Sequence, residues 1–459
     1  MRYHGVSRTR DTLFFILFLL FNLLPAHGQE LTKLTGVVLA QSAADGQSVP
    51  SISLPQTASG SYTTQALIRL ALVANGELTA ARLDIERARG RLRQAGLRSN
   101  PTAEAERTAG VLNSPGERNL AIGVTIPLEL NGQRQRRMEV AQTELAIAQA
   151  DIADRERRLA SEVRTLTTDI LTATRELEIL TDLGALDAQS VKIASDRVAI
   201  GDIPPLDLNL LKVEQDRRQA RRMLVEVQLK IALGRLKILV GLPVDAPLRL
   251  AESLASTSVP SVPDSVETSI TTALRLRPDL QMARLNEESA TARVRLARAQ
   301  GRPDVTAYTR YAANESSFDT TPIGFLNDRD KLLTFGLSVT IPVFNRNQGA
   351  KAEAEVAITQ AKRRREFLEQ LVRNEVTAAY DRWRVAKAVL DIYKTGVIDR
   401  SQQNLHTIRN SYEVGAFRIT EVIAEQRKFA DVQQEYTEIL AEYQHAWKNL
   451  VTAIGNPLD

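Results

Sequence analysis

The feature that most constrains this chain is that its sequence repeats itself. Residues 75–83 match residues 277–285, and residues 99–105 match residues 301–307, both at an offset of 202. Further along, Gly201 and Gly241 return as Gly415 and Gly455, both at an offset of 214. Matches that keep their order at a near-constant offset indicate a tandem duplication of about 210 residues, so both halves must adopt one plan.

Each copy predicts the same series of elements. A helix comes first, at about residues 64–97 and again at 279–300, and two strands joined by a polar loop follow it. Then come a very long helix, a break marked by glycine, and a second long helix. The growth of the offset is explained by residues 314–330, "NESSFDTTPIGFLNDRD", which we expect to be a loop present only in the second copy.

The predicted strands have one apolar face. Apolar residues alternate with small or polar ones from 120 to 126 and from 333 to 341, the period of a strand with one hydrophobic side. Each strand is about 10 residues long, which is what a tilted strand needs to cross a bilayer. An ordinary sheet of a soluble protein fits the strands alone equally well.

The predicted helices are unusually long. Residues 132–199 contain no proline and only one internal glycine, Gly184, and would extend for roughly 100 Å as a helix. Val163, Leu166 and Ile170 belong to an apolar line at heptad spacing. Helices of this length favour a bundle or tube in which they pack side by side.

The number of strands points to assembly. Two hairpins give four strands, which cannot close a barrel, and open sheet edges are not tolerated in lipid. Bacterial barrels begin at about eight strands. Three chains would supply twelve strands and one closed barrel, so a membrane location predicts a homotrimer.

The first 28 residues have the layout of a secretory signal peptide. Arg2, Arg8 and Arg10 precede an apolar run over 13–24, and small residues follow up to Gly28, where we expect cleavage. Because removal also takes away Asp11, the formal charge falls from +4 to +2, so the basic pI does not indicate a nucleic-acid partner. The chain has no cysteine, and its stability must come from packing or assembly.

Several motifs resemble those of the TolC-type outer-membrane efflux proteins, the outer membrane factors of tripartite pumps. The resemblance lies in the order of the motifs and in their duplication. They are "RPDL" at 277–280, "IPLELNGQ" at 126–133, "IPVFNRNQG" at 341–349, "SYEVGAFRITEV" at 411–422 and "AIGNP" at 453–457. The sequence of residues 341–349 is most similar to that of the cobalt–zinc–cadmium (CzcC-like) branch.

The resemblance implies a mainly α fold with a small β part. A homotrimer would form a twelve-stranded outer-membrane β-barrel, continuous with a periplasmic α-helical barrel and girdled by a belt from residues 242–272 and the C-terminus. The implied function is a passive exit duct, and the expected cargo is heavy-metal cations such as cobalt, zinc or cadmium. The implied partners are outer-membrane lipid, a periplasmic adaptor (membrane fusion protein) and an inner-membrane, proton-driven RND pump.

The corresponding layout has five parts. They are a signal peptide (1–28), an extended N-terminal arm (29–61), a first repeat (62–243, hairpin about 101–130, tip about 198–207), an equatorial linker (244–277) and a second repeat (278–459, hairpin about 303–344, tip about 412–421).

The tips carry the candidate pore residues. Asp207 and Glu421 are equivalent under the offset of 214, and the resemblance places such an acid at the constricted entrance. In a trimer they would form rings of carboxylates, which attract cations. Arg418 is a candidate partner that holds the entrance shut, although Phe417 departs from the basic residue of some relatives. The alternative is that both acids are ordinary helix-start residues favoured by the helix dipole.

Two further groups of residues are expected at the ends of the long helices. Adaptor contact, or plain turn chemistry, is expected for five residues at the tips: Val198, Gly201, Tyr412, Val414 and Gly415. Strand-to-helix turns at the membrane rim are expected for four residues: Pro127, Gly132, Pro342 and Gly349. The basic runs 134–137 and 362–365 are expected to be solvated helix faces, with contact to anionic lipid or sugar phosphate as the alternative.

No pattern of catalytic residues appears, so we expect no enzyme, no cofactor and no bound metal site. Two alternatives keep the same fold but change the cargo: multidrug efflux, or type I secretion and oligosaccharide export. A third is a periplasmic coiled-coil adaptor or structural protein without a pore, which would leave the two apolar-faced hairpins without a purpose.

Overall fold

A computed structural model describes residues 61–109, 118–256, 263, 265–320, 324–413 and 416–455. The predicted signal peptide, its cleavage site at Gly28 and nearly all of the N-terminal arm lie outside these residues. The chain divides into two units at Ser59, and every element below belongs to the second unit, which begins at Gly60.

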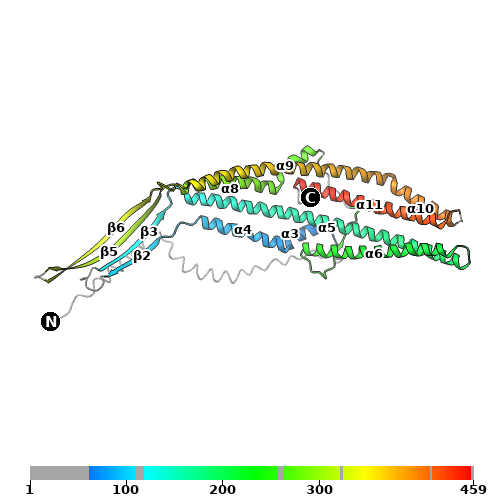
Figure 1. The fold of residues 1–459 in the computed structure, drawn as a ribbon, viewed down its shortest axis with the longest axis horizontal. Coiled ribbons are helices and arrows are strands. Elements are labelled where there is room, and N and C mark those ends of the chain that lie inside the picture. The colour runs from blue at the N-terminus through cyan, green and yellow to red at the C-terminus, as the bar shows by residue number, and fades with distance from the viewer. Residues whose placement is uncertain are drawn as a thin grey trace, which may run out of the picture. The chain divides into compact units, whose positions relative to one another are not determined.

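The described residues are mainly helical (Figure 1). The elements from the first half of the chain are β1 (Ser61–Tyr62), α3 (Thr64–Ala74), α4 (Gly76–Ala95), β2 (Thr102–Ala109), β3 (Arg118–Leu128), α5 (Gln133–Ala199), α6 (Pro205–Leu239) and β4 (Arg249–Leu250). Those from the second half are α7 (Val266–Leu276), α8 (Pro278–Gln300), β5 (Asp304–Thr320), β6 (Gly324–Thr340), α9 (Gln348–Ile392), the π-helix η1 (Tyr393–Val397), α10 (Ile398–Glu413) and α11 (Ile419–Ile454). The predicted mainly α fold with a small sheet is confirmed.

The larger sheet joins both hairpins in the order β2-β3-β5-β6, and every neighbouring pair is antiparallel. Its apolar side chains remain exposed on β6, where Phe335 is 74% and Leu337 is 67% accessible. The strands β5 and β6 have 17 residues each, so the predicted length of about 10 is wrong for this hairpin. The segment expected to be a loop continues the ladder, with Glu315 opposite Arg329 and an ion pair between them.

The first predicted helix is also wrong in one respect, because residues 64–97 form two helices. The break lies at Asn75, whose backbone leaves the helical region at φ −64° and ψ 122°. Its side-chain oxygen accepts a hydrogen bond from the N–H of Leu78 at 2.9 Å and so caps α4. Side-chain capping replaces the helical bonds that a continuous helix would need here.

The core lies where α3 and the end of α6 pack against the middle of α5. Leu67, Val163 and Leu236 are fully buried in it, which fits the predicted heptad line through Val163. The 67 residues of α5 also contact α4, α8 and α11 along the helix. Among the described helices, none is both long and apolar enough to cross a membrane.

The second long helix is interrupted where the first is continuous. Between α9 and α10, Gly396 has φ 175° and ψ −21°, outside the helical region. The interruption divides the second copy's counterpart of α5 into two helices, as Figure 1 shows in the orange part of the chain.

Candidate functional site

The first tip is a tight turn between α5 and α6. Gly201 has φ +76°, a conformation that glycine adopts without steric cost, and its N–H donates to the carbonyl of Val198 at 3.0 Å. Pro205 occupies the first position of α6, where a missing N–H costs little. Val198 is half-buried, and Gly201 is exposed.

In the second tip, Val414 and Gly415 lie outside the described residues. Before them, Tyr412 is half-buried near the end of α10. After them, Arg418 is the N-cap of α11. The exposed Phe417 precedes this cap.

The fold brings the two tips together. Ala194 and Leu211 from the first tip pack with Ile419, Val422 and Ile423 from the second in one buried cluster. Tyr412 packs against the same cluster. Two segments separated by more than 200 residues in the sequence therefore form a single four-helix end.

Asp207 and Glu421 occupy the same place in their helices, the third residue of α6 and of α11. Glu421 is exposed, and its Oε2 accepts a hydrogen bond from the backbone N–H of Arg418 at 2.8 Å. The contact between Glu421 and Arg418 is thus a helix cap. Among the described residues, the guanidinium of Arg418 has no carboxylate within 4.0 Å.

Charged pairs surround the joined tips. Arg197 binds Asp202 at 2.6 Å and lies 5.2 Å from the centre of the Tyr412 ring, a cation–π distance. Further from the tip, Arg427 of α11 binds Glu214 of α6 at 2.5 Å. The hydrogen bond from Arg427 holds the pKa of Glu214 below its usual value, despite the opposing effect of burial. The contact of Arg197 with Tyr412 and the ion pair of Arg427 with Glu214 link helices of the two repeats.

At the other end of the helices, the strand-to-helix turns use a left-handed residue in both copies. Gly132 has φ +69° and is the N-cap of α5, as expected for a turn. In the second copy the left-handed residue is Asn347, with φ +59°, and Gly349 lies inside the first turn of α9. The expectation that Gly349 forms the turn is therefore wrong, because asparagine tolerates this conformation and ends the turn earlier. Pro342 lies two residues after the last residue of β6, Thr340, whereas β3 continues one residue beyond Pro127.

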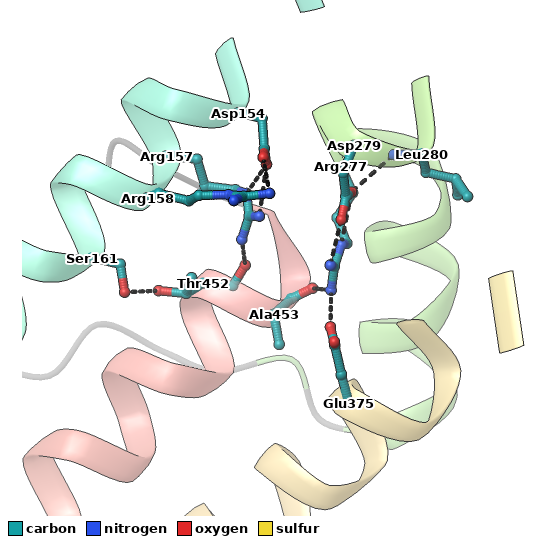
Figure 2. A network of polar contacts seen from close by, with 10 residues as sticks. All are labelled: Asp154, Arg157, Arg158, Ser161, Arg277, Asp279, Leu280, Glu375, Thr452 and Ala453. Carbon is teal, nitrogen blue, oxygen red and sulfur yellow. Dashed lines mark hydrogen bonds and ion pairs between the residues drawn. The ribbon is translucent and has the colours of Figure 1, made fainter. Parts of the chain in front are cut away.

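A second polar centre lies at the C-terminus of α11 and was not expected from the sequence (Figure 2). Arg157 donates to the carbonyl of Thr452 at 3.0 Å and is held by Asp154 at 2.7 Å. Arg277 donates to the carbonyl of Ala453 at 3.3 Å. Two buried guanidinium groups thus satisfy the last carbonyls of this helix, where positive charge is favoured by the helix dipole.

Carboxylates hold Arg277 in place. It binds Asp279 at 2.6 Å and Glu375 at 2.6 Å, while its own side chain is almost fully buried. Burial acts to raise the pKa of Asp279, but the hydrogen bonds and charge of Arg277 outweigh it and the pKa is lowered. The "RPDL" motif therefore has a structural role: it joins α8, α9 and the end of α11.

A buried lysine lies nearby on α11. Lys448 is 4% exposed, and its Nζ donates to the carbonyl of Arg164 at 2.7 Å and to the hydroxyl of Thr168. Burial lowers its pKa to about 8. No periodic signal marked this position as unusual, because one lysine in a long charged helix ordinarily faces solvent.

Comparison with known proteins covers both halves of the chain. The profile of the family described as "Outer membrane efflux protein" matches residues 67–242 and 269–456. The cobalt-zinc-cadmium resistance protein CzcC of Cupriavidus metallidurans is 26% identical over 409 residues, which cover 87% of this chain and 92% of that protein.

Solved structures show the same fold at lower identity. A structure of CusC is similar with a TM-score of 0.73 at 20% identity, covering 86% of this chain and 92% of that chain. The outer membrane protein VceC of Vibrio cholerae is similar with a TM-score of 0.70 at 18% identity, covering 86% of this chain and 97% of that chain.

Proposed function

The chain belongs to the family of outer membrane efflux proteins, and from this premise we propose that it is the exit duct of a tripartite system for heavy-metal cations. In this proposal a homotrimer conducts its cargo passively from the periplasm to the outside. An inner-membrane, proton-driven pump and a periplasmic adaptor supply the energy and the connection.

The exposed apolar surface supports assembly and a place in the membrane. On α6, exposed apolar residues follow one heptad line: Leu206, Leu210, Val213, Leu224, Val227, Ile231 and Ile238. On α9, the exposed Leu371, Val385 and Ile392 lie seven or fourteen residues apart. Such stripes are what a long helix presents to another helix in a coiled coil. A second copy of the chain is the partner that the proposed tube requires.

The sheet supports the same assembly. Within the part of the chain that the structure describes, the outer strands β2 and β6 each pair with one neighbour, so each has an unpaired edge there. In lipid such edges must be closed. Three copies placed edge to edge would form the proposed twelve-stranded barrel, with the apolar face of β6 towards the acyl chains.

The proposal that the cargo is a heavy-metal cation rests on one observation. This is the similarity to CzcC, a cobalt-zinc-cadmium resistance protein, over most of both chains. The tips are compatible with it, since a trimer would bring together three copies of Asp207 and of Glu421. Metal ions are cargo here, and a duct needs only an attractive field. Carboxylate rings supply such a field to cations.

The proposal is tested by deleting the gene in its own host and measuring growth inhibition. The panel contains cobalt, zinc, cadmium, nickel, copper and silver beside dyes, bile salts and antibiotics. Sensitivity confined to metals supports the proposal and identifies the cargo. Sensitivity spread over dyes and antibiotics would move the cargo to drugs and leave the fold and duct unchanged.

A further inference from the structure

The four connectors between helices and strands lie at the same end of the sheet (Figure 1). With one adjoining helical turn each, they comprise residues 92–101, 129–136, 297–303 and 341–351, which we call the rim collar. Asn131 Nδ2 donates to the carbonyl of Pro303 at 2.6 Å, and Arg134 Nε donates to the carbonyl of Gly96 at 2.6 Å. These bonds join connectors from both halves of the chain.

The rim collar is strongly positive. It contains one carboxylate, Glu129, which Arg137 just outside the collar already binds at 2.9 Å. Against it stand eight basic side chains: Arg93, Arg98, Arg134, Arg136, Arg298, Arg302, Arg346 and Lys351. The net charge of the collar is therefore +7 in one chain, whereas the mature chain as a whole is nearly neutral.

Most of this charge has no internal counter-charge. Arg136 binds Glu139, and Arg298 binds Glu355. Five other arginines are exposed and form no ion pair among the described residues: Arg93, Arg98, Arg134, Arg302 and Arg346. In the proposed trimer, neighbouring collars would add like charge, which favours anions from outside the protein.

The collar also exposes large apolar side chains beside the arginines. Phe344 is 91% exposed two residues from Arg346, and Leu97 is 57% exposed next to Arg98. Leu130 and Val343 are exposed in the same connectors. Water alone is a poor environment for such a group, whereas the boundary between acyl chains and headgroups suits an aromatic ring beside a long basic side chain.

We propose that the rim collar binds the phosphate groups of anionic phospholipids in the periplasmic leaflet of the outer membrane. The guanidinium forks of Arg98, Arg302 and Arg346 match a phosphate with two parallel hydrogen bonds. Phe344 and Leu97 enter the acyl boundary beside them. The inference rests on the proposed function, which sets the sheet in the membrane and the helices in the periplasm.

The test uses the full mature protein reconstituted in phosphatidylcholine vesicles. Spin-labelled phosphatidylglycerol and phosphatidylcholine report their relative association with the protein surface by electron paramagnetic resonance. We expect about a fivefold preference for phosphatidylglycerol at low salt, which decreases as salt screens the contact. The variant R98Q/R302Q/R346Q should lose most of it. The matched control R235Q/R275Q/R373Q removes three exposed arginines of α6, α7 and α9 that form no ion pair with any described residue, and it should retain the preference.

Equal preferences in the wild type and in the rim variant would overturn the proposal, as would an equal loss in the control. A preference that inorganic phosphate abolishes at matched ionic strength would show that the collar takes free anions, and would also overturn it. Channel conductance in phosphatidylcholine bilayers is recorded on the same samples. Conducting protein without lipid preference refutes only the lipid contact, and absence of conductance refutes the duct itself.

Discussion

Lys448 offers the most direct test of the packing between α5 and α11, because its charge is buried among groups that do not neutralise it fully. The side chain reaches only a carbonyl and a hydroxyl, while Arg164 adds like charge and Glu252 and Asp169 act in the opposite sense. Burial dominates, and the pKa falls from 10.5 to about 8. At neutral pH the ammonium group of Lys448 is charged in the folded protein, where it is solvated less favourably than in water. Its charge therefore destabilises the folded state.

The sign and size of the effect follow from linkage. Between pH 8 and 10.5 the unfolded chain keeps the proton of Lys448 and the folded chain has released it, so stability rises with pH in this window. The difference in pKa corresponds to about 3 kcal/mol at neutral pH, and about 2 kcal/mol of this is recovered between pH 7 and pH 9.5. Lys448→Met removes the titration, while the hydrogen bonds that it loses affect both pH values alike.

The assay is urea unfolding at pH 7 and pH 9.5, followed by fluorescence of the buried Trp447 in a Trp383→Phe background. The stability of the wild type relative to Lys448→Met should increase by about 2 kcal/mol between the two pH values. Lys428→Met is the control, since this lysine of the same helix has a side chain that is 71% exposed. A relative stability as flat for Lys448→Met as for the control would refute the reasoning.

Three other predictions concern the tips, the "RPDL" motif and a glycine. Glu421→Gln keeps the cap on Arg418 but removes the charge, so the cation selectivity measured by reversal potential should fall. The control Glu267→Gln on α7 should leave it unchanged. Equal reversal potentials in the wild type and both variants would exclude Glu421 from the pore. Arg277→Ala removes the counter-charge of Asp279 and the side-chain donor to the carbonyl of Ala453, and should cost about 3 kcal/mol in urea unfolding, while the exposed Arg275→Ala should cost little. Gly241→Ala places a Cβ 2.5 Å from the carbonyl oxygen of Ala74 at φ +70°, whereas Gly201→Ala at φ +76° meets open space. Gly201→Ala should lower the stability by about 1 kcal/mol, and Gly241→Ala should lower it clearly more. Equal losses of stability would contradict the packing described.

The sequence predicted those features that depend on periodicity. The extent of α5 follows from an uninterrupted helical pattern, and α8 lies within one residue of the helix predicted at 279–300. The breaks that it missed depend on single side chains. Asn75 ends one helix because its amide caps the next, and Gly396 interrupts the second long helix although Gly184, inside α5, does not interrupt the first. The presence of a glycine alone does not distinguish these cases.

The candidate site was predictable at the level of position in the chain. The equivalence of Asp207 and Glu421 in the sequence returns as the same third position of α6 and α11. Their joint packing was not predictable, because it depends on contacts between Leu211 and Ile419, which are far apart in sequence. Whether these acids face a pore stays a prediction, since it depends on neighbouring copies of the chain.

The two copies solve one structural problem with different chemistry. Asn75 and Arg277 are equivalent and have nearly the same backbone angles, φ −64° with ψ 122° and 123°. Asn75 accepts from Leu78 and donates to the carbonyl of Leu239 at 3.0 Å, so one neutral amide caps both α4 and the end of α6.

A guanidinium can donate but cannot accept, so Arg277 caps only α11, and Asp279 must accept from the N–H of Leu280 at 2.8 Å. The same carboxylate then neutralises Arg277 in a buried position. The equivalent residue of the first copy, Glu77, is also a carboxylate but is exposed, so the second copy differs in burying its carboxylate beside a guanidinium. For that reason Arg277→Asn should not restore the arrangement of the first copy, because Asp279 would remain buried without its main counter-charge.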